Sequence, residues 1–291
     1  DIDAWRATIR PNTKLLFGET VGNPGLDVLD IPVVAQIAHE HGLPLLVDAT
    51  LSTPYLLQPL SLGADLLYHS ATKFLSGHGT VIGGVLVDGG SFDWEASGRF
   101  AELTQPYDGF HDMVFSEEST VGAFLLRARR EGLRDFGACM SPHTAWLILQ
   151  GLETLPLRMD RICENTLAVA QFLASHPKVE WVDYAGLPGH VDHAVAQRLL
   201  GGKASGLMTF GVKGGCSAGE RFLDALQLFT RLVNIGDTKS LATHPASTTH
   251  RQLSPEELAR AGVKEETVRL CVGIEHIDDL RADLTQALEK A

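Results

Sequence analysis

Short, wholly apolar runs alternate with amphipathic stretches in the first half of the chain, and this alternation restricts the fold more than any other feature. Four apolar runs at 14–20, 43–50, 64–70 and 83–90 are typical of strands, and 31–42 has apolar residues at helical spacing. Continuous apolar character, rather than alternation with period two, indicates a sheet that is buried on both faces. We therefore predict a mostly parallel sheet flanked by helices, with crossover connections between its strands.

Longer helical stretches follow from Thr120 onward, at 124–137 and 141–176. Ser141 and Pro142 suit the start of the second stretch, and Pro156 predicts a break within it. Strands are expected at 178–184, 206–213, 229–236 and 267–274, interleaved with helices at 217–227, 254–262 and 277–291. We predict two domains, 1–150 with the parallel sheet and 151–291 as a smaller α/β unit whose sheet is partly antiparallel.

Composition narrows the classes of partner. Twenty-four Lys and Arg against thirty-six Asp and Glu give a formal net charge of −12, which disfavours nucleic acid and anionic membranes as partners. Four cysteines without a CxxC pair indicate reduced thiols and a cytoplasmic protein. No apolar run is long enough to span a membrane, and the histidines lack an accompanying metal-ligand constellation. We expect a small-molecule ligand, no membrane, no nucleic acid and no metal.

The segment 70–79, SATKFLSGHG, directly follows an apolar strand and combines a lysine with hydroxyls and glycines. Open α/β sheets bind ligands at the carboxyl ends of their strands, which is where Lys73 is expected. Ser70 and Thr72 could donate to a phosphate, and Lys73 could form a Schiff base with an aldehyde cofactor. A solvated loop lysine beside turn residues is an equally weighted alternative.

Two further strand ends carry polar residues. Asp48 follows the apolar run 43–47, where a carboxylate is costly unless it is paired, and it could hold a protonated pyridine nitrogen. Its alternative is a cap for a helix that starts nearby. Asn23 lies in GETVGNPG, where a sharp turn could present its amide to a ligand or could be structural only.

Five segments in order, ETVGNP, VDAT, SATKFLSGHG, TKSLATHPAST and VRLCVGIE, resemble the pyridoxal-phosphate enzymes of cysteine and methionine metabolism. The segment 106–120 and the long helices after it are similar to the O-acetylhomoserine sulfhydrylase branch of that family. The resemblance implies fold type I, an aminotransferase-like α/β fold. It also implies γ-replacement, in which O-acetyl-L-homoserine and sulfide, or methanethiol, react in a homotetramer built from dimers.

The resemblance also assigns roles to individual residues. Lys73 matches the Schiff-base lysine, and Ser70 and Thr72 match hydroxyls that bind the cofactor phosphate. Asp48 matches the partner of the pyridinium nitrogen, with Thr50 as a supporting contact. The remaining matches are Asn23 near the cofactor's 3′ oxygen and, for the substrate carboxylate, Ser240 and Arg269. His78 and His244 fall near these sites by the same resemblance and receive no role.

Members of the family carry an N-terminal portion of roughly a third of their length, which has no counterpart before Lys14. The chain therefore resembles such an enzyme from the middle of its first domain onward. That third carries a glycine-rich phosphate loop and a tyrosine that stacks on the cofactor. The alternatives are therefore a related enzyme, such as cystathionine γ-synthase, an O-succinylhomoserine sulfhydrylase or methionine γ-lyase, and an inactive or merely ligand-binding fragment.

Overall fold

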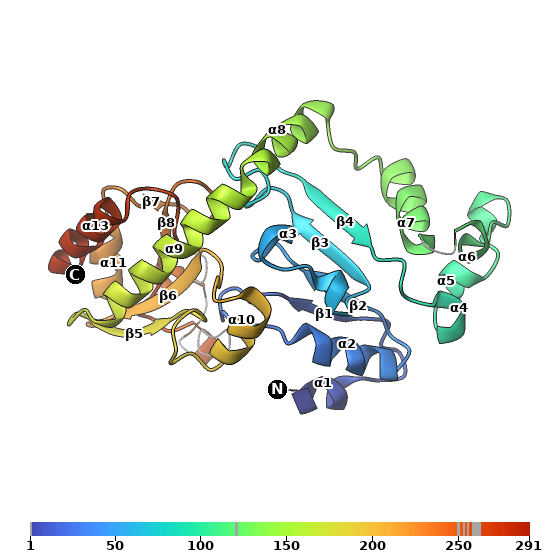
Figure 1. The fold of residues 1–291 in the computed structure, drawn as a ribbon, viewed down its shortest axis with the longest axis horizontal. Coiled ribbons are helices and arrows are strands. Elements are labelled where there is room, and N and C mark those ends of the chain that lie inside the picture. The colour runs from blue at the N-terminus through green and yellow to red at the C-terminus, as the bar shows by residue number, and fades with distance from the viewer. Residues whose placement is uncertain (1, 120–121, 249–250, 253, 255, 258–262) are drawn as a thin grey trace.

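Two β-sheets, joined by one long helical segment, organise the computed structural model, which describes residues 2–119, 122–248, 251–252, 254, 256–257 and 263–291. The first sheet lies in the middle of the molecule and the second near the C-terminus (Figure 1). The helices α8, Pro142–Glu153, and α9, Leu155–Ala174, run from one to the other. None of the described helices has the length and apolar character needed to cross a bilayer.

The first sheet has the order β1-β2-β3-β4. Its strands are β1 Leu16–Glu19, β2 Leu45–Asp48, β3 Leu66–Ser70 and β4 Gly84–Asp88. The first three are parallel, as predicted, and α2, Ile31–Glu40, connects β1 to β2. Pro32 suits the first turn of α2, and the apolar residues at helical spacing, Ile31, Val34 and Ile37, are fully buried.

Two expectations for this sheet are wrong. β4 pairs antiparallel with β3, because the chain between them turns back at the carboxyl end of β3 without a crossover helix. One face is not fully buried, since Phe17 on β1 is 47% exposed and Leu86 on β4 is 39% exposed. Continuous apolar sequence therefore overstated the burial of this face.

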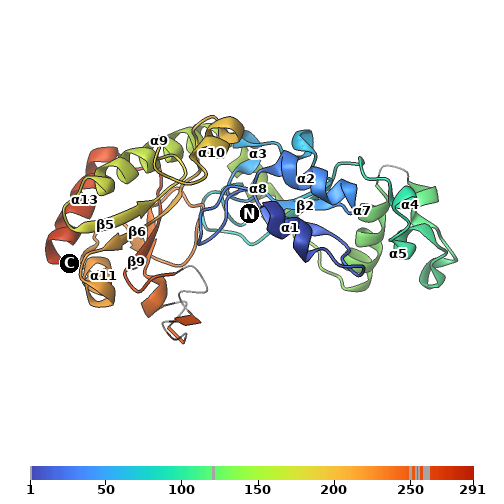
Figure 2. The same ribbon diagram turned by 90° about the horizontal axis from the view of Figure 1, so that it is seen from below.

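Short helices lie beside the first sheet or extend from one end of it. They are α1 Ile2–Thr8, α3 Thr53–Leu56, the 3-10 turn Pro59–Leu62, α4 Trp94–Ser97, α5 Ala101–Thr104, the 3-10 turn Asp108–Phe110, α6 Phe115–Glu118, α7 Ala123–Ala128 and a π-helical stretch Arg129–Asp135. The group α4 to α7 projects at the end of the molecule away from the C-terminus (Figure 2). It packs around a second, small cluster, which includes Trp94, Phe100 and Phe115 together with Leu66 of β3.

The second sheet has the order β5-β6-β9-β8-β7, and three of its four strand pairs are antiparallel, where a partly antiparallel sheet was predicted. Its elements are β5 Val179–Asp183, α10 His193–Leu200, β6 Leu207–Val212, α11 Gly215–Ala225, β7 Thr230–Arg231, β8 Leu241–Thr243, the 3-10 turn Pro245–Ser247, β9 Thr267–Cys271 and α13 Ile277–Lys290. The predicted strand at 229–236 is reduced to the two residues of β7. The prediction omitted α10 and β8, and the helix expected at 254–262 lies largely outside the described residues.

The helical stretch at 141–176 divides as predicted. The Ser141 hydroxyl accepts a hydrogen bond from the backbone N–H of Thr144 at 3.1 Å and caps α8, and α9 starts at Leu155 with Pro156 in its first turn. The domain boundary expected at 150/151 falls inside α8 and stays a prediction.

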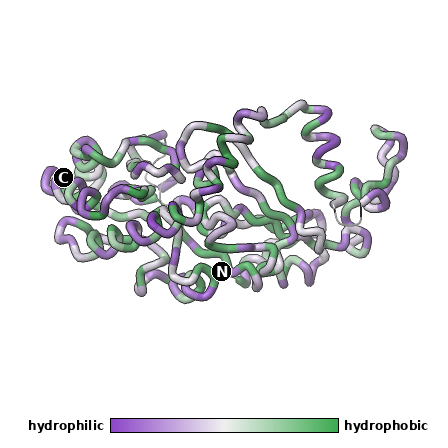
Figure 3. The backbone as a smooth tube through the Cα atoms, turned by 45° about the horizontal axis from the view of Figure 1, so that its top comes forward, coloured by the Kyte–Doolittle hydropathy of each residue, from purple (hydrophilic) through white to green (hydrophobic). Residues whose placement is uncertain are grey.

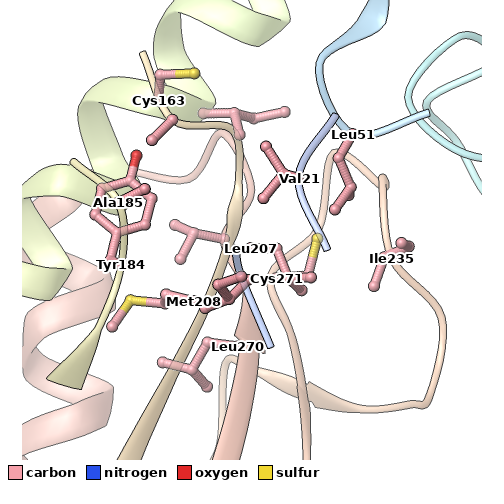
Figure 4. Packing of buried hydrophobic residues seen from close by; sticks show 14 of the residues in the cluster. Val21, Leu51, Cys163, Tyr184, Ala185, Leu207, Met208, Ile235, Leu270 and Cys271 are labelled. Carbon is pink, nitrogen blue, oxygen red and sulfur yellow. The ribbon is translucent and has the colours of Figure 1, made fainter. Parts of the chain in front are cut away.

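One hydrophobic core serves both sheets. Val21 and Leu51, from the first half of the chain, lie beside Leu207 and Cys271 of the second sheet (Figure 4). Long hydrophobic tracts follow the strands, whereas the outer helices show alternating hydrophilic and hydrophobic bands (Figure 3). The Ser205 hydroxyl adds a hydrogen bond of 2.6 Å to the Leu51 carbonyl oxygen across the same contact. The edge of the first sheet where β1 to β3 end is therefore held against the second sheet.

Candidate active site

Polar side chains lie side by side where the parallel strands of the first sheet end. The register pairs Glu19 of β1 with Asp48 of β2, and Asp48 with Tyr68 of β3, so the three side chains share one face. The Asp48 carboxylate accepts a hydrogen bond from the Thr50 N–H at 2.8 Å, and the Thr50 hydroxyl accepts one from the Ser70 N–H at 2.8 Å. Asp48 is thus fixed at the strand end, and Thr50 ties β2 to β3.

Two carboxylates, Glu19 and Asp48, lie side by side at the ends of β1 and β2. Hydrogen bonding to the Asp48 carboxylate, with burial, raises the pKa of Tyr68 to about 12. Burial and the nearby Asp48 charge raise the pKa of Glu19 as well. Among the described residues no Lys, Arg or His lies within ion-pair distance of Asp48. A half-buried carboxylate with no cation of its own suits a cationic ligand atom.

Lys73 stands on a tight turn directly after β3. The turn is closed by hydrogen bonds from the Lys73 N–H to the Ser70 carbonyl oxygen at 3.1 Å and from the Gly77 N–H to the Lys73 carbonyl oxygen at 2.8 Å. The half-buried Lys73 amine donates to the Asn234 side-chain oxygen. Burial, and then the positive charge of Arg269, lower the pKa of Lys73. A lowered pKa increases the fraction of neutral amine, which is the nucleophilic form.

A segment of the second half covers the lysine turn. Gly236 has a φ of +77° and lies so close that a Cβ there would be 2.6 Å from the Phe74 nitrogen and 2.8 Å from the Lys73 Cβ. The Thr238 N–H donates to the Gly77 carbonyl oxygen at 2.9 Å. Only glycine allows this approach, so the segment from 234 to 238 is packed directly against the turn that carries Lys73.

Arg269 of β9 is the second cation of the site. Its guanidinium donates to the Asn23 side-chain oxygen at 3.2 Å and to the Val233 carbonyl oxygen. The Asn23 N–H bonds in turn to the Glu19 carboxylate. Among the described residues no carboxylate lies within ion-pair distance of Arg269, and burial lowers its pKa. A guanidinium that contacts only neutral oxygens can bind an incoming carboxylate through its planar fork.

The two hydroxyls that flank the lysine differ in their bonding. The Thr72 hydroxyl donates to the Gly83 carbonyl oxygen at 3.2 Å and accepts from the Gly83 N–H at 3.0 Å. It therefore fastens the turn to the chain before β4, rather than pointing a free donor toward a phosphate. The Ser70 hydroxyl makes no hydrogen bond to the described residues, so its donor is available to a ligand.

Ser240 also differs from the expectation for a carboxylate ligand. Its fully buried hydroxyl donates to the Glu275 carboxylate at 2.9 Å and accepts from the Gly273 N–H at 2.8 Å. A carboxylate can only accept, so it cannot take the proton that the hydroxyl already gives to Glu275. In this geometry Ser240 fixes the loop after β9, and Arg269 is the group that faces the site.

Three residues at the site escaped the sequence analysis. Asn234 contacts the Lys73 amine, Tyr68 contacts Asp48, and buried Arg158 donates to the lysine turn from α9. Tyr68 had a detectable signal, because it lies two residues before Ser70 and so shares a face with it in a strand. Arg158 and Asn234 are distant in sequence from Lys73 and had none.

The histidines without assigned roles stay outside this constellation. His78 is exposed, whereas buried His244 hydrogen-bonds the Ser247 hydroxyl at 2.9 Å and the Glu265 carbonyl oxygen at 2.7 Å. Within the described ranges no group of three or more His, Cys, Asp or Glu side chains is arranged to hold a metal ion.

Comparison with known proteins gives concordant matches. The family model described as Cys/Met metabolism PLP-dependent enzyme matches residues 1–289. The chain is 48% identical to an O-acetyl-L-homoserine sulfhydrylase of Leptospira meyeri, over 99% of this chain and 67% of that protein. It is 50% identical to O-acetyl-L-homoserine sulfhydrylase 1 of Thermus thermophilus, over 95% of this chain and 66% of that protein. The chain thus spans about two thirds of the length of these curated relatives.

A solved structure supports the fold. The chain superimposes with a TM-score of 0.94, at 40% sequence identity, on a crystal structure described as an O-acetylhomoserine (thiol)-lyase from Campylobacter jejuni. The match covers 99% of this chain and 69% of that one, which contains N′-pyridoxyl-lysine-5′-monophosphate. The α/β fold expected from the motifs is confirmed.

Proposed function

The chain belongs to the Cys/Met metabolism PLP-dependent enzyme family, and we propose that the protein catalyses γ-replacement on O-acetyl-L-homoserine. Sulfide would replace the acetyl ester to give L-homocysteine and acetate, and methanethiol in its place would give L-methionine. The sulfhydrylases among the relatives support this choice of substrate. The observation that carries the proposal is the placement of the half-buried Lys73 amine. It lies near the Arg269 guanidinium, which has no ion-pair partner among the described residues, and it follows the strand next to the one that ends at Asp48.

The residues present fit pyridoxal phosphate. Lys73 supplies an amine whose lowered pKa favours bonding to an aldehyde, and Asp48 supplies a carboxylate without a cation for the ring nitrogen. The Ser70 hydroxyl, which makes no hydrogen bond to the described residues, suits the phosphate. When bound, the cofactor withdraws electrons from the substrate Cα and so makes its proton acidic.

Each remaining residue has a task that its contacts support. Arg269 would hold the substrate carboxylate, and Asn23, which already bonds that guanidinium, would lie beside the ring. Lys73 would take the Cα proton and then a Cβ proton as acetate leaves Cγ, and it would return protons to Cβ and Cα after sulfide has added at Cγ. Thr50 would keep Asp48 in place, and Ser240 would hold the loop beyond Arg269.

Trapping the lysine tests the cofactor assignment. Borohydride reduction of the protein loaded with pyridoxal phosphate should place a pyridoxyl group on Lys73, as read by peptide mass spectrometry. Lys73→Ala should abolish this label and lower turnover by at least about 10²-fold, the lower end of general acid–base contributions. Lys213→Ala, at an exposed lysine, is the matched control and should change neither. A label that maps elsewhere while Lys73 stays unmodified would falsify the assignment.

Substrate preference needs a separate assay. Turnover of the acetyl and succinyl esters of homoserine should be compared, each with sulfide and with cysteine as the nucleophile. Preference for the acetyl ester with sulfide supports the proposal. Preference for cysteine would identify a cystathionine γ-synthase, and release of methanethiol from methionine would identify a γ-lyase.

Assembly and location are part of the same proposal. The family resemblance leads us to propose a homotetramer built from dimers, which sedimentation would test. The four cysteines, Cys139, Cys163, Cys216 and Cys271, are all free thiols, which supports a reducing, cytoplasmic location.

A further inference from the structure

Arg158 of α9 is a buried cation placed directly behind the lysine turn. It is only 4% exposed, and none of the described carboxylates lies within ion-pair distance of it. All of its hydrogen bonds go to neutral oxygens, and burial lowers its pKa. Because an unpaired buried charge is costly, a side chain that only filled space here would be apolar. The guanidinium therefore needs an explanation from what it contacts.

Its contacts are the carbonyl oxygens at the end of the turn that carries Lys73. The guanidinium donates to the Phe74 oxygen at 2.7 Å and to the Leu75 oxygen at 3.4 Å. These two residues follow Lys73 directly. Carbonyl oxygens at the end of a helical turn lack intrahelical partners and carry partial negative charge, so a cation complements them. Arg158 thus satisfies the turn that sets the direction of the Lys73 side chain.

The same guanidinium reaches the junction between α8 and α9. It donates to the Gly151 carbonyl oxygen at 2.7 Å and to the Thr154 hydroxyl at 3.2 Å. Glycines leave the room that this arrangement needs. A Cβ at Gly77 would overlap the guanidinium, and a Cβ at Gly151 would overlap the Ser76 carbonyl group. One planar fork therefore ties the lysine turn to the helices that join the two sheets.

We propose that Arg158 is a positioning residue for Lys73, which it holds through the turn at the geometry that proton transfer requires. This inference rests on the proposed function for the role of Lys73. Arg158 forms no hydrogen bond with any side chain assigned to cofactor or substrate binding, so it acts only through the turn. Misplacement of a catalytic group by about 1 Å can cost 10²-fold in rate. Because its guanidinium spans three carbonyl groups of this turn and of α8, Arg158 determines turnover rather than binding.

Two variants of Arg158 test the inference against a matched core variant. Arg158→Met removes every donor, and Arg158→Lys keeps the charge but cannot span the carbonyl groups. Val169→Ala, at a fully buried position about three turns further along α9, should lower stability without touching the lysine turn. The measurements are thermal unfolding, kcat and KM, the pH dependence of the absorbance of the bound cofactor, and the rate at which Lys73 is trapped by pyridoxal phosphate and borohydride.

We expect Arg158→Met to lower kcat by about 10²-fold, with KM changed by less than about threefold. The pH at which the absorbance changes and the trapping rate should both shift, and Arg158→Lys should recover part of each. Val169→Ala should lower the Tm and leave kcat, KM, the pH dependence of the absorbance and the trapping rate unchanged. If both Arg158 variants have a lower Tm but unchanged kcat, pH profile and trapping rate, as expected for Val169→Ala, then Arg158 is only structural and the inference is wrong.

The trapping rate separates this inference from the proposed function. If wild-type protein showed no γ-replacement but its Lys73 were still trapped, the proposed function would fail. The effect of Arg158→Lys on the trapping rate and on the absorbance profile would then still decide the inference. Arg158→Lys also serves if Arg158→Met does not fold, since an unchanged rate and profile in that variant would count against positioning.

Discussion

Lys73 and Arg269 are two neighbouring cations, and no carboxylate of the described residues lies within ion-pair distance of either. Their closeness is unfavourable while both are charged, which contributes to the lowered pKa of Lys73. The neutral oxygens of Asn23 and Val233 hold Arg269 without cancelling its charge. The pair thereby keeps a guanidinium without an ion-pair partner among the described residues beside an amine that loses its proton more readily than an exposed lysine does.

Arg269→Gln should separate these two effects. Loss of the charged fork should raise KM for the amino-acid substrate by about 10- to 100-fold, since hydrogen bonds to charged groups contribute about 1.5–3 kcal/mol. The pKa of Lys73 should rise, because the neighbouring charge that favours the neutral amine is gone. Burial, the larger cause of the lowered pKa, remains, so the rise should be partial.

The pH dependence of Lys73 modification measures this pKa. In Arg269→Gln the same modification rate should be reached only at higher pH than in wild type. Arg231→Gln, at an exposed arginine paired with Asp224, is the matched control and should leave the profile unchanged. Identical profiles for Arg269→Gln and wild type would show that the two cations are independent.

At the scale of single residues, the sequence identified the groups at strand ends and missed the groups that arrive from elsewhere. Lys73 and Asp48 were detectable because a polar residue after a buried strand is unusual. Arg158 resembled any charged residue on a helix, since helical spacing does not reveal that its face is buried. The bonding of the Ser240 hydroxyl depends on Glu275, 35 residues away, and that pairing leaves no pattern in the sequence.

At the scale of elements, α8 packs so closely on the lysine turn that it has no room for a side chain at Gly151. A Cβ there would overlap the Ser76 carbonyl group. Gly151→Ala should therefore push the helix from the turn and lower the free energy of unfolding by about 1–3 kcal/mol, the usual cost of overpacking. Turnover should fall as well, because the same turn carries Lys73.

Gly132→Ala is the matched control for that variant. Gly132 lies in the helical stretch 129–135, and a Cβ there would meet nothing within 4 Å. Replacement by alanine should stabilise the protein slightly, by up to about 1 kcal/mol, through the unfolded state. Denaturant unfolding of both variants checks the pair, and equal stability would show that the close approach at Gly151 is not maintained in solution.

The elements themselves were predictable where their pattern was local. Buried strands and the capped start of α8 follow from apolar runs and from Ser141. The direction of β4 was not predictable, because it depends on how the chain folds back after the lysine turn. Turn geometry leaves little trace in the pattern of hydrophobic residues. The short strand β8 was missed because three residues are too few to show a period.

At the scale of the whole molecule, the site exists only because the two sheets share a core. Lys73 and Asp48 come from the first sheet and its turn, whereas Arg269 and Asn234 come from the second half of the chain. The backbone N–H of Val28 also donates to the Asp192 carboxylate at 2.9 Å across the same boundary. Cooperative unfolding of both sheets is the expected consequence.

Leu207→Ala tests this coupling. Leu207 is fully buried on β6, in the shared core beside Val21 and Leu51, so its truncation should cost about 2–5 kcal/mol. If the core is shared, the amides of β2 and β6 should lose hydrogen-exchange protection together, although only β6 is mutated. Leu157→Ala, at a leucine that is 73% exposed, should change neither. Loss of protection confined to β6 would mean that the sheets open separately, and the two halves of the site would then be free to part.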